Sequence, residues 1–159
     1  MNDWTPQGTS TKDRNLYEPF IAFIKDSIAE LTAKGHQVEL AGIFYHDGEN
    51  DMSCDSYRQD AAKWLQSTVA QSRKSLAMPE LKWFVSQQPP TDEKGLNTID
   101  VTANLVAIAA EDPAFFHLKA FDLLPQQEQL VINTEGIFKL GEILAQGYLR
   151  RVSKIKRPK

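Results

Sequence analysis

The run Tyr45-His46-Asp47-Gly48-Glu49-Asn50-Asp51 gathers the side chains of this chain that are best suited to chemistry. It places three carboxylates and one imidazole around a glycine, and these groups can transfer protons and bind polar ligands. The run follows an apolar stretch, residues 38–44, which is typical of a buried strand. In open α/β sheets, ligands bind beyond the carboxyl ends of the strands. The sequence therefore predicts that His46, Asp47, Gly48 and Glu49 bind a substrate at a strand end.

The carboxylates of this run do not have the spacing of a calcium loop. An EF-hand counted from Asp47 needs glycine at its sixth position and glutamate at its twelfth, where this chain has Met52 and Arg58. The chain also lacks a glycine-rich phosphate loop and the Cys/His spacing of a zinc site. We therefore expect neither a metal nor a cofactor, and we interpret the carboxylates as a solvated loop.

Strands and helices alternate along the chain. Strands are predicted at residues 38–45, 81–86 and 115–121, each bounded by turn residues. Apolar residues at helical spacing predict four helices: residues 16–34, a second from 53–56 to Pro79, a third from about Thr98 to Pro113, and a last one carrying Ile137, Leu140, Leu144 and Tyr148. This alternation predicts an α/β fold, with a parallel sheet between two layers of helices.

One domain is expected for 159 residues. We divide the chain into an irregular segment at 1–14, an α/β domain at 15–150 and a basic tail at 151–159. The first helix has no strand before it, and three strands make a small sheet. The pattern therefore predicts a flavodoxin-like sheet that lacks its N-terminal strands.

Composition excludes several classes of protein. The net charge of -3 argues against general nucleic-acid binding, which needs clustered cations. Cys54 is the single cysteine, so an internal disulfide cannot form. The first twenty residues carry several charges and no long apolar run, so we expect neither a signal peptide nor a membrane span. The chain as it stands suits the cytoplasm, whereas a longer version could be secreted or periplasmic.

The run at 45–51 resembles the Trp-x-Gln-Gly-Glu-x-Asp block of the sialate O-acetylesterase-like carbohydrate esterases, a branch of the SGNH hydrolases. Gly48, Glu49 and Asp51 match that block, His46 is compatible with it, and Tyr45 replaces one aromatic residue by another. The segment 133–141, Asn-Thr-Glu-Gly-Ile-Phe-Lys-Leu-Gly, resembles the closing segment of the family. The resemblance covers most of residues 4–149 and implies an SGNH-like, three-layer fold.

Several departures concern the catalytic residues of the family. Asp47 stands where the family has a glutamine, and a carboxylate there would repel a developing oxyanion. Val131 stands at the position of the catalytic histidine, and Glu128 at that of the acid three residues earlier. The chain has no Gly-x-Ser turn after a predicted strand that could supply the nucleophile. His46 could act as a substitute base, although a structural role for this histidine is the simpler interpretation.

The resemblance implies hydrolysis of acetyl esters on carbohydrates by a Ser-His-Asp mechanism without metal or cofactor. Because of the departures, we expect this chain to be inactive or weakly active alone, as a pseudoenzyme would be. An alternative is a non-catalytic descendant that binds an acetylated carbohydrate or a protein through the edge that holds the active site in the family. A further alternative is self-association through an incomplete sheet.

Overall fold

The computed structural model describes residues 2–8, 14–47, 55–87, 101–119, 126–127 and 131–152. The helices are η1 (Asn2–Trp4, a 3-10 turn), α1 (Tyr17–Ala33), α3 (Asp55–Ser75), α4 (Val101–Glu111) and α5 (Thr134–Val152). The strands are β1 (Ile43–Asp47), β2 (Trp83–Gln87), β3 (Phe115–His117), β4 (Gln126–Gln127) and β5 (Val131–Ile132). Among these residues, no helix is long and apolar enough to cross a membrane.

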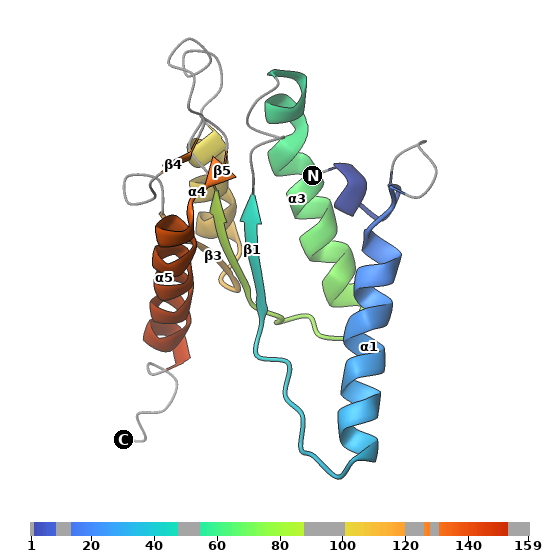
Figure 1. Ribbon diagram of the computed structural model, residues 1–159. Helices are drawn as coiled ribbons and strands as arrows, with labels where there is room; N and C mark the ends of the chain where they lie inside the picture. The colour runs from blue at the N-terminus through green and yellow to red at the C-terminus, as the bar shows by residue number, and fades with distance from the viewer. Residues whose placement is uncertain are drawn as a thin grey trace.

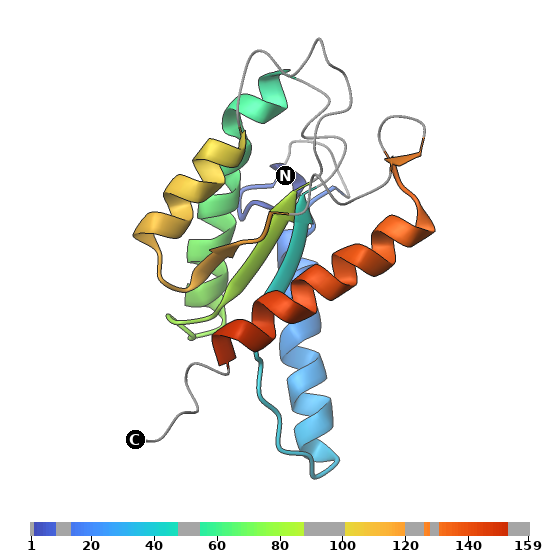
Figure 2. The same cartoon turned by 90° about the vertical axis from the view of Figure 1, so that its left-hand side faces the viewer.

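The central sheet is parallel, with the strand order β1-β2-β3. Helices α1, α3 and α4 lie on one side of it, and α5 crosses the other side (Figures 1 and 2). The predicted α/β fold, with a parallel sheet between two helical layers, is confirmed. Because the strands are parallel, β1 and β2 end at the same edge of the sheet, as a shared site would require.

The main hydrophobic core lies between the sheet and the helices α3 and α4. The odd-numbered strand residues Ile43, Trp83 and Phe115 face this core, and each is less than 9% exposed. Leu65 and Val69 of α3 and Leu105 and Ile108 of α4 complete it. Alternation along each strand therefore sends every second side chain into this layer.

The opposite face of the sheet carries a row of phenylalanines. The ring of Phe84 stacks on Phe44 at 4.9 Å and lies 5.0 Å from the ring of Phe116. Tyr148 of α5 packs edge-on against Phe84 at 5.8 Å, and the guanidinium of Arg151 lies 4.7 Å from the Phe116 ring. These aromatic contacts hold α5 on the sheet.

All three predicted strands are shorter in the structure, and the strand predicted at 81–86 begins at Trp83 and ends at Gln87. The strand predicted at 38–45 begins only at Ile43, because β2 offers no partner residue for an earlier part of the run. The N–H of Ile43 donates to the Lys82 carbonyl, directly before β2, at 2.8 Å. The strand predicted at 115–121 ends at His117, which pairs with Val85. An apolar run sets where a strand can form, and the length of its neighbour sets where it does form.

Local stop signals predicted the ends of α1 and α4 more accurately, whereas α3, which was expected to run to Pro79, ends at Ser75. Helix α1 ends at Ala33, and Gly35 follows with φ +85°, a left-handed conformation that favours glycine. Helix α4 ends at Glu111, just before Pro113. The small antiparallel hairpin of β4 and β5 was not predicted, because its strands have two residues each and the first consists of glutamines.

Candidate functional site

The polar residues that end β1 and β2 lie side by side in the sheet. The parallel register pairs His46 with Ser86 and Asp47 with Gln87. His46 is half-buried, whereas Ser86 is 0% exposed. The structure therefore places one predicted site residue, His46, next to a buried hydroxyl that comes from 40 residues further along the chain.

A hydrogen bond of 2.9 Å joins Nδ1 of His46 to Oγ of Ser86. A hydroxyl can donate to a neutral imidazole nitrogen or accept from a protonated one, so this contact fixes the ring in either case. Sequence reasoning missed Ser86. The signal that could have found it is a serine at the end of the second strand, but matching it to His46 requires the register of the two strands.

Tyr45 serves the core rather than a ligand. Its ring lies 6.2 Å from that of Trp83 and 6.4 Å from that of Trp4 in η1. Trp4 in turn packs edge-on against Phe20 of α1 at 5.8 Å. The aromatic residue that opens the run at 45–51 therefore ties the N-terminal segment and α1 to the sheet.

The segment before α5 is fixed by a helix cap. The side-chain oxygen of Asn133 accepts a hydrogen bond of 2.9 Å from the N–H of Gly136 in the first turn of the helix. Val131 lies in β5, two residues before this cap, with its backbone paired to Gln127. Strand β5 therefore carries this position directly into the start of α5.

Several predicted site residues cannot be placed. Gly48, Glu49 and Glu128 lie outside the described residues, and for Asp47 the structure describes the backbone alone. The sequence predictions for these four residues therefore remain predictions. Of the predicted site residues, His46 alone has a described side chain.

His117 lies on the core side of the sheet, because it pairs in register with Val85 in the row that faces α3 and α4. Burial lowers its pKa below the usual value of 6.5, since the apolar surroundings disfavour the imidazolium. The histidine is therefore neutral in the folded protein at neutral pH, in keeping with a structural role.

This shifted pKa predicts how stability depends on pH. Below about pH 6.5 the unfolded chain takes up a proton at His117 and the folded chain does not, so stability falls as the pH drops toward the lower folded pKa. The slope contributed by one such group is at most about 1.4 kcal/mol per pH unit. Urea unfolding at several pH values should show that His117→Gln loses less free energy of unfolding on acidification than the wild type does. The control variant His36→Gln, at an exposed site, should lose as much as the wild type.

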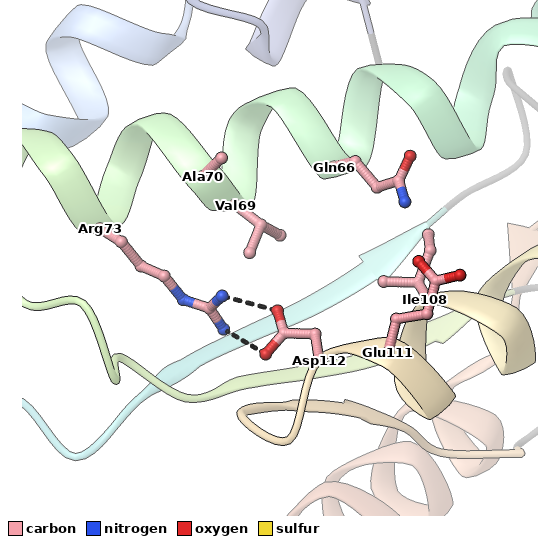
Figure 3. A pocket seen from close by; sticks show the side chains of 7 residues that line it. All are labelled: Gln66, Val69, Ala70, Arg73, Ile108, Glu111 and Asp112. Atoms are coloured by element: carbon pink, nitrogen blue, oxygen red, sulfur yellow. Dashed lines mark hydrogen bonds and ion pairs between the residues drawn. The ribbon is translucent and has the colours of Figure 1, made fainter.

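A groove between α3 and α4 is a less suitable place for the site (Figure 3). Its volume is about 140 Å³, whereas small-molecule pockets usually have roughly 300–1,000 Å³. Val69, Ala70 and Ile108 line it, and the ion pair of Arg73 with Asp112 spans one end. Arg73 also donates to the carbonyl of Leu81, just before β2, so the ion pair lies at the amino edge of the sheet.

Comparison with known families decides where this chain belongs. The family model of the carbohydrate esterases described as sialic acid-specific acetylesterases matches residues 1–150. The chain belongs to this family. The resemblance of the run at 45–51 is thereby confirmed at the level of the family.

The fold has a solved counterpart in a protein from Arabidopsis thaliana. That crystal structure matches this acetylesterase-family chain with a TM-score of 0.67 and 18% sequence identity. The match covers 93% of this chain and 55% of the Arabidopsis chain, so this chain spans about half of that protein's length. At this identity the likeness shows the fold alone. A comparison with curated proteins finds no match.

Proposed function

We propose that this member of the sialic acid-specific acetylesterase family binds acetylated carbohydrate but hydrolyses acetyl esters little or not at all by itself. The observation that carries the proposal is Val131, which stands where the resemblance to the family places the catalytic base. A valine side chain cannot accept a proton. Hydrolysis by a serine esterase needs a nucleophile, a base within about 3 Å of it and a group that orients the base.

His46 is a poor replacement for this base. Its Nδ1 is hydrogen-bonded to Ser86, which is neutral, so nothing in this contact would stabilise an imidazolium as a carboxylate does. Ser86 is also a poor nucleophile, because its side chain is 0% exposed and an ester could not reach it. The pair therefore supports a role in shaping the strand end more than a role in transferring protons.

Polar residues at the carboxyl edge of the sheet support the proposal that the chain binds acetylated carbohydrate. His46 and Ser86 occupy the carboxyl ends of adjacent parallel strands, where α/β proteins bind ligands. In the sequence, Glu49 and Asp51 of the matched block follow directly. An acetylated sugar offers hydroxyl donors and carbonyl acceptors that such groups recognise.

With the purified chain present, p-nitrophenyl acetate is expected to be hydrolysed no faster than in buffer alone, because Val131 stands at the position of the catalytic base. Calorimetry with an O-acetylated sialic acid on the same sample should detect binding, and Glu49→Ala should weaken it while Glu142→Ala, on α5, should not. Hydrolysis well above the buffer rate that disappears in His46→Ala would contradict the catalytic half of the proposal. Absence of any binding would contradict the other half.

A further inference from the structure

A hollow lies where the chain enters β1 and β2, at the amino edge of the sheet. Its volume is about 250 Å³. Residues 39–41, which lead into β1, and residues 78–82, which lead into β2, line it. The N–H of Ile43 donates to the carbonyl of Lys82 at 2.8 Å, so the hollow begins just before the two segments join in the sheet. It therefore lies at the other end of the strands from the proposed carbohydrate site.

Apolar side chains form the floor of the hollow, and two carboxylates form its rim. Leu81 is 2% exposed and Leu40 is half-buried, whereas Glu39 and Glu80 are exposed. Within the part of the chain that the structure describes, neither glutamate side chain forms an ion pair or a hydrogen bond. Lys82 also lines the hollow, so its lining carries two carboxylates against one cation. Such a lining suits a segment in which an apolar residue stands between cations.

Helix α5 ends at the same edge of the sheet. The guanidinium of Arg151, one residue before the helix ends, lies 4.7 Å from the centre of the Phe116 ring. Phe116 is the second residue of β3, and it pairs with Phe84, the second residue of β2. Figures 1 and 2 both show α5 ending at the end of the sheet where the strands begin. The chain that follows Val152 therefore starts from the edge that holds the hollow.

The part of the basic tail that follows α5, residues 153–159, lies outside the described residues, but its sequence matches the hollow. It has no acidic residue, and its four cations are Lys154, Lys156, Arg157 and Lys159. In an extended chain the two lysines that flank Ile155 point to one side and Ile155 points to the other. Seven extended residues span about 23 Å. This reach exceeds the roughly 10 Å between packed layers of a domain, so the segment can pass from the α5 side of the sheet to the hollow.

We propose that residues 153–159 bind back into this hollow. Ile155 contacts the apolar floor, and the lysines on either side of it pair with Glu39 and Glu80. The tail of the same chain is favoured over that of a second copy, because a tether of a few residues gives a high effective concentration. Bound in this way, the tail connects the end of α5 to the entrances of β1 and β2.

Carbodiimide cross-linking of the full chain tests which groups meet, because the reagent joins a lysine amine and a carboxylate that are in contact. Mass spectrometry of the monomer should find Lys154 or Lys156 joined to Glu39 or Glu80. Glu142, which is exposed on α5, is the control and should not be joined to them. The proposal would be overturned if these lysines were joined to neither rim glutamate. Links to the rim found only between two chains would assign the hollow to the tail of a second copy and overturn it as well.

Hydrogen exchange of the full chain tests the individual contacts. Amides of residues 38–42 should exchange about fivefold faster than in the wild type when the contacts are removed by Lys154→Gln with Lys156→Gln, or by Ile155→Ser. The matched control is Arg157→Gln with Lys159→Gln, which removes the same charge outside the proposed contacts. Exchange in the control should stay within about twofold of the wild type. Unchanged exchange in every variant, or equal acceleration by the two double variants, would contradict the proposed contacts.

Discussion

Replacing Phe84 by alanine is expected to lower the free energy of unfolding by about 3–5 kcal/mol. Phe84 is 0% exposed and touches the rings of Phe44, Phe116 and Tyr148. Its removal would leave a cavity under α5 that the rigid sheet cannot close. The loss is large compared with the roughly 5–15 kcal/mol that stabilises a typical domain.

Urea unfolding followed by circular dichroism measures this loss directly. Phe138→Ala is the matched control, because it removes the same ring from α5 at a position that is 72% exposed. It should change stability by no more than about 0.5 kcal/mol. If both variants unfolded at the same urea concentration, the phenylalanine row would not be what holds α5 on the sheet.

The second large effect is expected from the ion pair of Arg73 and Asp112 (Figure 3). Nη1 of Arg73 lies 2.6 Å from Oδ2 of Asp112, and Nε donates to the Leu81 carbonyl at 3.0 Å. Asp112 also accepts a hydrogen bond of 2.9 Å from the N–H of Ala114. The pair therefore joins the end of α3 to the segments that enter β2 and β3.

Arg73→Met is expected to lower the free energy of unfolding by about 2–4 kcal/mol, since it leaves a largely buried carboxylate without its cation. The side chains of Arg73 and Asp112 are 15% and 23% exposed, so the effect should be somewhat below that of a fully buried pair. Replacing both partners by apolar residues, Arg73→Met with Asp112→Leu, should restore much of the loss.

Arg14→Met provides the control for this pair. It breaks the ion pair with Asp3, in which the arginine side chain is 63% exposed, and pairs of that kind contribute about 1 kcal/mol or less. Urea unfolding of the three variants at one pH gives the comparison. Equal effects of Arg73→Met and Arg14→Met would show that the groove between α3 and α4 does not depend on its ion pair.

The sequence by itself determined the class of the fold and the family. Gly35 and Pro113 are stop signals that act on their own neighbours, so the ends of α1 and α4 could be predicted without a tertiary structure. The alternation of helices and strands likewise predicted the parallel sheet. The run at 45–51 identified the family because its residue types and spacing are visible in the chain alone.

Only the tertiary structure decided what depends on residues far apart in the chain. Strand β1 starts at Ile43 because Trp83, its partner in the register, is the first residue of β2, and His46 meets Ser86 because the same register aligns them. The packing of Tyr148 on Phe44 and Phe84 likewise follows from the path of α5 across the sheet. The hydrogen bonds of a sheet need two strands, whereas a local sequence signal describes one segment at a time. That is why the ends of α1 and α4 could be predicted from the sequence, whereas the strand ends and the contact of His46 with Ser86 could not.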